Sequence, residues 1–321
     1  MGTEPRRARP SVRSGGAALS IATITFEDGD RCLNWAELLD ALEAGHKLPK
    51  AEIGDTFLYR GNDTLLSRAA WIDGLGQSVK TATIFPGNSA LNKPSINGSV
   101  SLFSDQTGEL EAVIDFHLVT KWKTAGDSLL AAKKLARPNS RNILIVGAGT
   151  VAGSMVSAYR SLFPEASFSV WNRSENRARQ FADEHKLAFV NDLPSAVAAA
   201  DIICTATMST EPVISGDWLQ PGQHLDLIGA YRPDMREVDD TALQKARIFV
   251  DSFDTTLDHI GELKIPLSQG ALSREHVIAD YYALEKFVRR SDDEITIAKN
   301  GGGAHLDLMT SKYILESCNA E

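Results

Sequence analysis

Hydrophobic and polar positions alternate most regularly in the middle of the chain. From residue 141 onward, short apolar runs are separated by stretches whose apolar residues recur at helical spacing. Short apolar runs indicate buried strands, and helical spacing indicates amphipathic helices packed on them, so this region predicts a βαβ series with a parallel sheet. The predicted strands are 142–149, 167–173, 188–190, 201–207, 224–230 and 247–253, and the predicted helices include 174–185, 193–200 and about 275–290.

Residues 20–137 mix strands and helices without this regularity. Their pattern predicts a helix over 31–45 ended by Gly45, a hairpin over 56–72 that turns at Gly61-Asn62-Asp63, and strands within 78–88 and 98–115 with a turn at Gln106-Thr107-Gly108. The last part of the chain, 294–317, predicts a strand, a glycine run and a helix.

Thr120 is predicted to cap a helix over 121–137 that Pro138 ends. That start places Lys121 and Lys123 in the first turn, where the positive end of the helix dipole disfavours cations by roughly 0.3–1 kcal/mol each. Two lysines at such a position indicate either a bound anion or side chains that extend into solvent, and we favour the anion for Lys123.

Composition excludes several classes of protein. The 321 residues are 43% hydrophobic, which is enough for two domains with buried cores. A net charge of −9 argues against a general binder of nucleic acid or anionic membranes, and no apolar run reaches the roughly 18–20 residues that span a bilayer. Three widely spaced cysteines favour a reducing cytoplasm and indicate no metal site. We expect residues 1–18, which are arginine-rich and lack a secretory apolar core, to be a disordered tail.

A glycine motif follows the first strand of the parallel series. "ILIVGAGTVAGS" places Gly147, Gly149 and Ala152 in the G-x-G-x-x-A pattern, with Thr150 and Val151 opening a helix. Gly147 would allow the tight turn, Gly149 the approach of a pyrophosphate, and Ala152 close packing of helix on strand. Because the motif lies between a buried strand and a helix, it predicts a dinucleotide-binding Rossmann domain.

The end of the second strand predicts which dinucleotide binds. NAD sites usually carry an acidic residue there, whereas this chain has Asn172, Arg173 and Ser174, with Arg177 one turn later. An arginine can hold a 2′-phosphate through a bidentate contact, which a carboxylate would repel. We therefore expect NADPH as the cofactor, with NADH possible but less favoured.

These segments together resemble the ornithine cyclodeaminase/mu-crystallin family. The resemblance covers about residues 50–315 and rests on "VKTATIFPGN", "TKWKTAGDSLLAAKKLA", "ILIVGAGTVA", "ICTATMSTEPVI", "HLDLIGAYRPDMREVDD" and "KNGGGAHLDLMTSKYI". It implies an α/β fold in which a Rossmann domain, residues 139–291, is inserted in an α+β substrate-binding and dimerisation domain, residues 19–138 plus 292–321. It also implies a homodimer with the active site between the two domains.

The resemblance also assigns residues to the substrate. Lys80 matches a substrate-contacting lysine of the family, and Lys123 stands where the family has a carboxylate-binding arginine, in "KTAG". A further family arginine matches Arg60 only approximately. Thr207 and Gly229, at predicted strand ends, are expected beside the nicotinamide. Asn300 and His305, on either side of the glycine run, are further candidates for the pocket, His305 as a hydrogen-bond donor.

One departure from the family changes the predicted reaction. Cyclodeaminases carry an aspartate at the position of Tyr231, and a tyrosine, with a reference pKa of about 10, cannot act as a carboxylate base. The resemblance therefore favours reduction of a cyclic ketimine, Δ1-pyrroline-2-carboxylate and/or Δ1-piperideine-2-carboxylate, in which Tyr231 shapes the pocket or donates a hydrogen bond. The alternatives are an ornithine cyclodeaminase, a dehydrogenase of a linear amino acid, and a mu-crystallin-like protein that binds NADPH and a ligand without turnover.

Overall fold

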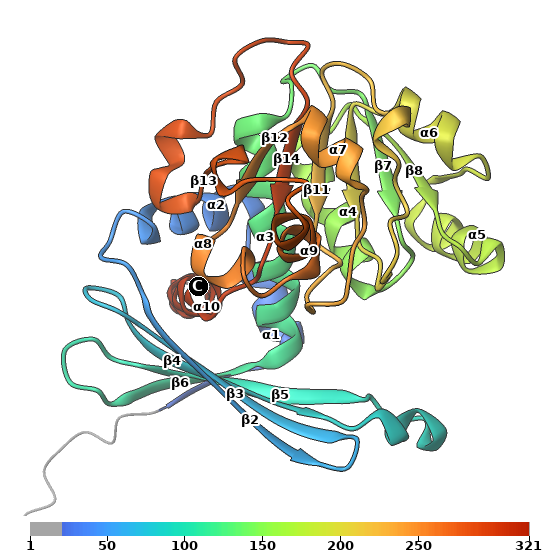
Figure 1. The fold of residues 1–321 in the computed structure, drawn as a ribbon. Coiled ribbons are helices and arrows are strands. Elements are labelled where there is room, and N and C mark those ends of the chain that lie inside the picture. The colour runs from blue at the N-terminus through green and yellow to red at the C-terminus, as the bar shows by residue number, and fades with distance from the viewer. Residues whose placement is uncertain (1–20, 321) are drawn as a thin grey trace, which may run out of the picture.

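The computed structural model describes residues 21–320, so the predicted tail at residues 1–18 lies outside the described residues. A six-stranded sheet forms the lower layer of Figure 1. Its strands in spatial order are β1 (Ala22–Ile24), β6 (Leu110–Asp115), β5 (Ile96–Phe103), β4 (Gly76–Ile84), β3 (Asp63–Ile72) and β2 (Glu52–Arg60). Only the first pair is parallel. Buried and less buried residues alternate along β4, because one face of the sheet is covered.

Glycines make both predicted turns of this sheet. Gly61 joins β2 to β3 with a φ of 57°, and Gly108 lies between β5 and β6 with a φ of 68°. Side chains with a Cβ atom rarely adopt these positive φ values, which explains the residue type at each turn. The predicted hairpin and the predicted turn at Gln106-Thr107-Gly108 are confirmed.

Two helices, α3 (Phe116–Leu135) and α10 (Ala304–Asn319), cover one face of the six-stranded sheet, and α1 (Phe26–Cys32) and α2 (Trp35–Gly45) pack on these two helices (Figure 1). The prediction of one helix over 31–45 was wrong at its start. The side chain of Asn34 accepts a hydrogen bond from the backbone N–H of Ala36 at 2.8 Å and so begins a new helix. The predicted end at Gly45 is confirmed.

The predicted start of α3 was also wrong. Asp115, and not Thr120, caps the helix, because its Oδ1 accepts from the backbone N–H of Leu118 at 2.9 Å. Lys121 and Lys123 therefore lie beyond the first turn, where the helix dipole has little effect. The dipole argument for an anion at Lys123 therefore does not hold. Whether Lys123 can bind an anion depends on the residues around it.

The upper layer of Figure 1 is an eight-stranded sheet whose neighbouring strands are all parallel. The order is β13 (Val277–Ala279), β12 (Arg247–Val250), β14 (Thr296–Lys299), β11 (His224–Leu227), β10 (Ile202–Thr205), β7 (Asn142–Val146), β8 (Ser167–Trp171) and β9 (Ala188–Phe189). The helices of this part are α4 (Thr150–Leu162), α5 (Glu175–His185), α6 (Leu193–Ala199), α7 (Asp240–Lys245), α8 (Phe253–Thr256) and α9 (Gly261–Gln269). The predicted βαβ series and the α/β fold class are confirmed.

Two predictions for the last quarter of the chain were wrong. β14 was assigned to the substrate domain, but it lies between β11 and β12 in the parallel sheet. No long helix forms over 275–290; short 3₁₀ turns flank β13 instead. The rings of Tyr281 and Phe287 from this segment are buried, and the Tyr281 hydroxyl donates to the backbone oxygen of Asp127 at 2.6 Å.

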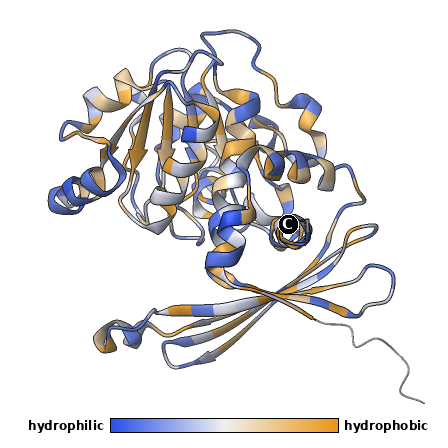
Figure 2. Cartoon of the chain, turned by 180° about the vertical axis from the view of Figure 1, so that it is seen from behind, coloured by the Kyte–Doolittle hydropathy of each residue, from blue (hydrophilic) through white to orange (hydrophobic). Residues whose placement is uncertain are grey.

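The two layers share one hydrophobic core. A continuous cluster joins Ile114 of the six-stranded sheet, Leu129 of α3 and Leu308 of α10 to Ile145 and Ile202 of the parallel sheet. In Figure 2 the parallel strands are hydrophobic along their length, whereas α5 at the rim is mainly hydrophilic. Because α3 and α10 lie between the layers, they bring polar side chains of the substrate part close to the carboxyl ends of the parallel strands.

Candidate active site

The glycine motif forms an open turn before α4. Gly147 has a φ of 123°, and a Cβ atom there would approach the backbone oxygen of Ala206 to 2.6 Å, so only glycine fits. A Cβ atom on Gly149 would meet nothing within 4 Å, which leaves room for a ligand at the helix N-terminus. Ala152 is fully buried and lets α4 pack closely on the sheet. This geometry fits the phosphates of a dinucleotide.

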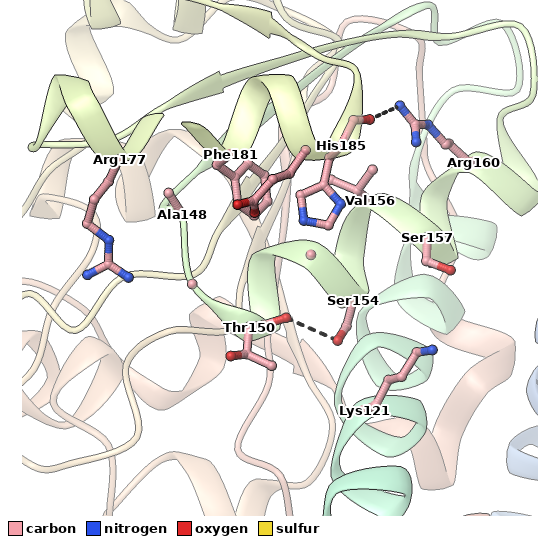
Figure 3. A pocket seen from close by; sticks show the side chains of 13 residues that line it. Lys121, Ala148, Thr150, Ser154, Val156, Ser157, Arg160, Arg177, Phe181 and His185 are labelled. Carbon is pink, nitrogen blue, oxygen red and sulfur yellow. Dashed lines mark hydrogen bonds between the residues drawn. The ribbon is translucent and has the colours of Figure 1, made fainter. Parts of the chain in front are cut away.

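A cavity of about 670 Å³ lies beside this turn (Figure 3). Gly149, Thr150 and Arg177 line one end of it, and Lys121 lines the α3 side. Figure 3 shows the side chain of Arg177 extending from α5 alongside the glycine turn. The end of the cavity near Gly149 therefore combines backbone N–H groups with positive charge.

The loop after β8 presents the residues predicted to select the cofactor. Asn172 donates from its side chain to the backbone oxygen of Ser174 at 3.0 Å, which fixes the loop locally. Arg173 and Arg177 are exposed, and within residues 21–320 neither guanidinium has an ion-pair partner. Both remain available to an anionic group.

Thr207 and Gly229 lie side by side after β10 and β11. The carboxylate of Glu237 accepts from the backbone N–H and the hydroxyl of Thr207 at 2.8 and 2.7 Å, and from the backbone N–H of Gly229 at 2.8 Å. A Cβ atom on Gly229 would lie 2.1 Å from the backbone oxygen of Thr207. The two predicted nicotinamide-side residues are thus brought together, and Glu237, which was not predicted, joins them.

Lys80 forms the centre of a buried charge cluster. Its Nζ lies 2.8 Å from Asp307 Oδ1 of α10 and donates to the hydroxyl of Thr120 at 2.9 Å. Burial lowers the pKa of Lys80 to about 8. The nearby cations Lys123 and Arg68 also lower this pKa, whereas the carboxylate of Asp307 raises it. Burial alone would raise the pKa of Asp307, but Lys80, Lys123 and Arg68 together hold it below its usual value. The cluster can therefore bind an anion and supply a proton near neutral pH.

Lys123 connects this cluster to the glycine run before α10. It is buried, and its Nζ lies 3.4 Å from the backbone oxygen of Gly302. The backbone N–H of Gly302 in turn donates to Asp251, which follows β12, at 2.7 Å. The backbone of Gly302 thus joins the lysine cluster to the strand ends of the parallel sheet.

Comparison with known proteins agrees with this geometry. The model of the ornithine cyclodeaminase/mu-crystallin family matches residues 72–321. The chain belongs to this family. It is 49% identical to a Delta(1)-pyrroline-2-carboxylate reductase of Paracoccus denitrificans over 91% of this chain and 95% of that protein. It is also 32% identical to the mouse ketimine reductase mu-crystallin over 75% of each chain.

Solved structures of similar proteins share the whole fold. A Delta(1)-pyrroline-2-carboxylate reductase of Thermococcus litoralis, in complex with NADH and L-proline, is 25% identical with a TM-score of 0.84, covering 94% of this chain and 98% of that one. An archaeal alanine dehydrogenase dimer with bound NAD is 28% identical with a TM-score of 0.84, covering 94% and 96%. The family resemblance drawn from the motifs is confirmed.

The structure places Arg60, the approximate match of a family arginine, outside the lysine cluster. Arg60 lies at the tip of the β2–β3 hairpin, exposed and paired with Asp63. Arg68 is the arginine that joins the cluster: it pairs with Lys80 across β3 and β4, binds Asp55 at 3.0 Å, and donates to the backbone oxygen of Gly302 at 2.9 Å. The pairing register of β3 and β4, which the sequence pattern did not predict, would have identified Arg68.

Tyr231, which separates this chain from family members with an aspartate there, lies outside the cluster. The residue is 59% exposed on the loop after β11, and the Arg232 guanidinium lies 5.9 Å from the centre of its ring. Within residues 21–320 it has no contact with the lysines, so its role in the reaction stays a prediction.

His305 and Asn300 are both buried beside the glycine run. Burial lowers the pKa of His305 to about 3, and its ring packs edge-on against His46 with 5.4 Å between centres. A neutral ring can donate a hydrogen bond, as predicted, but it holds no extra proton at neutral pH. The side-chain oxygen of Asn300 has no hydrogen-bond partner among the described residues.

Two further properties concern residues 21–320. Every helix in this range is too short or too polar to cross a membrane. The same range gathers no group of three or more His, Cys, Asp or Glu side chains that could hold a metal ion.

Proposed function

We propose that this chain is an NADPH-dependent ketimine reductase that acts on Δ1-pyrroline-2-carboxylate and/or Δ1-piperideine-2-carboxylate and forms L-proline or L-pipecolate. The observation that carries the proposal is the cluster of the buried Lys80 and Lys123 with the partly buried Arg68, joined through Gly302 to the strand ends of a dinucleotide-binding sheet. A small anionic substrate held there would lie beside the nicotinamide. The 49% identical reductase of Paracoccus denitrificans supports the choice of substrate.

The residues divide into those that hold the carboxylate and one that supplies a proton. Lys123 and Arg68 can bind the substrate carboxylate together, since both already donate to one acceptor, the backbone oxygen of Gly302. When bound, NADPH supplies the hydride that adds to the imine carbon. The imine nitrogen must also gain a proton, and Lys80, with a pKa of about 8, can carry it there. Anchoring the carboxylate fixes the imine carbon for the transfer.

Arg173 and Arg177 support NADPH over NADH. Both are exposed near the end of β8, where an NAD site usually has a carboxylate. Arg173→Asp should lower the affinity for NADPH far more than that for NADH, as measured by titrating cofactor fluorescence. Equal losses for both cofactors would contradict this preference.

We propose that the dimer forms when a second copy of the chain packs on the open face of the six-stranded sheet. Leu58, Leu65 and Trp71 point to this face and are 60%, 39% and 52% exposed, and Figure 1 shows the helices on the other face only. Leu65→Lys should shift the mass measured by light scattering from two chains to one, because burying the ammonium would be unfavourable. Val288→Lys, at an exposed residue of the other layer, is the control. An unchanged mass for Leu65→Lys would exclude this face as the interface.

One assay separates the proposed reaction from its alternatives. Purified protein is mixed with NADPH and each ring imine, and nicotinamide absorbance is followed; ornithine with NAD⁺ is tested in parallel for proline and ammonia. We expect imine-dependent oxidation of NADPH and no ammonia. Ammonia release without imine reduction would indicate a cyclodeaminase, and cofactor binding without either reaction would indicate a binding protein.

A further inference from the structure

Glu237 is a fully buried carboxylate with four hydrogen bonds to two loops. Its Oε1 accepts from the backbone N–H and hydroxyl of Thr207, after β10, at 2.8 and 2.7 Å. Its Oε2 accepts from the backbone N–H groups of Gly229 and Ala230, after β11, at 2.8 and 3.3 Å. Each oxygen therefore holds one loop, and the carboxylate fixes the separation between them.

Two other buried charged residues hold this arrangement in place. The carboxylate of Glu262 accepts from the backbone N–H groups of Glu237 and Val238 at 2.7 and 3.1 Å. On the other side, the ammonium of Lys299 donates to the backbone oxygens of Leu227, Ala230 and Asn300 at 2.7 to 2.8 Å. We call Glu237, Glu262 and Lys299 the strand-end network. It joins the loops after β10, β11 and β14.

The network lies where the nicotinamide half of a dinucleotide should bind. The glycine turn after β7 takes the phosphates, and β10 and β11 are the next strands of the sheet in the direction away from β8. In open α/β sheets the ligand lies outside the carboxyl ends of the strands, so the ring should reach the loops after β10 and β11.

We propose that Glu237 is a positioning residue that fixes the Thr207–Gly229 wall and thereby the nicotinamide ring facing the imine. The inference rests on the proposed cofactor and reaction. A carboxylate suits the task because all four of its partners are donors, whereas an amide would turn a donor toward one loop. The residue acts through Thr207 and Gly229 and does not itself touch the substrate.

Glu237→Gln tests this role, with Glu285→Gln, at an exposed carboxylate, as the matched control. We expect Glu237→Gln to lower kcat by about 10- to 100-fold, since a displacement of about 1 Å at the reacting centre has such an effect. Cofactor affinity should change much less, because the phosphate turn is untouched. The isotope effect with cofactor deuterated at the transferred position should rise as hydride transfer becomes limiting. Glu237→Asp, which keeps four acceptor sites, should recover part of the rate.

A second measurement needs no substrate. Time-resolved fluorescence anisotropy of bound NADPH should show a more mobile ring in Glu237→Gln than in the wild type or the control. Unchanged kcat, isotope effect and ring mobility would overturn the proposal. So would a loss of activity that only follows the fraction of unfolded protein. If the wild type reduces no ring imine, the proposed function fails, and the anisotropy still decides the role of Glu237.

Discussion

Arg68 and Lys80 are direct partners across β3 and β4, so their side chains share the covered face of the sheet. The lysine was predicted from its motif, but the arginine was not, because strand register depends on pairing between residues far apart in the sequence. Lys123 was predicted both from its motif and from a place in the first turn of α3, and the second argument was wrong, since α3 begins at Phe116. Residue types in a motif were therefore more informative than helix position for this site.

Arg68→Met should raise the KM for the imine about 10- to 100-fold, because a charged hydrogen bond to the carboxylate contributes about 1.5–3 kcal/mol. Arg60→Met is the matched control, since Arg60 lies at the exposed hairpin tip. Steady-state kinetics with saturating NADPH measures both. A larger effect at Arg60 than at Arg68 would show that the wrong arginine has been assigned to the pocket.

Lys80→Met should lower kcat by about 10²- to 10⁴-fold, the usual range for a lost proton donor, and leave NADPH affinity intact. The substitution also leaves Asp307 buried without its partner at 2.8 Å, which can destabilise the fold by about 3–5 kcal/mol. The double variant Lys80→Met/Asp307→Asn removes that charge and should restore the thermal midpoint but not the rate. Turnover near the wild-type level in either variant would remove Lys80 from the mechanism.

At the scale of elements, local signals predicted the βαβ series and both glycine turns. They did not predict the segment 275–290, where Asp280 begins a short turn by accepting from the backbone N–H of Tyr282 at 3.2 Å. The burial of Tyr281 and Phe287 then holds the chain in an irregular path. Local signals also did not predict the place of β14 in the parallel sheet, because a four-residue strand carries no information about which strands it will pair with.

The start of α3 depends on one cap that a substitution can test. Asp115→Ala should lower the free energy of unfolding by about 0.5–2 kcal/mol, since the side chain satisfies the backbone N–H of Leu118. Asp183→Ala, at an exposed position within α5, should change it little. Chemical denaturation measures both. If Thr120→Ala lowered the free energy of unfolding and Asp115→Ala did not, the helix would begin at Thr120 and not at Asp115.

At the scale of the molecule, the shared core between the two sheets isolates several histidines from water. Burial lowers the pKa of His46 to about 4 and those of His224 and His305 to about 3, from 6.5 in the unfolded chain. Since the folded protein holds these rings neutral, their contribution to stability is present above pH 6.5. It is lost as pH falls toward the folded pKa values.

His46→Gln isolates one of these contributions. The free energy of unfolding of the wild type relative to the variant should be constant above pH 7 and should fall by about 1.4 kcal/mol per pH unit between about pH 6 and pH 4. The buried Asp226 and Glu262, whose pKa values burial raises, act in the opposite direction in both proteins and cancel in the difference. Denaturant titrations at several pH values measure the difference. A difference that stays constant down to pH 4 would mean that His46 is reached by water in the folded protein, and that the core between the two sheets is open at that point.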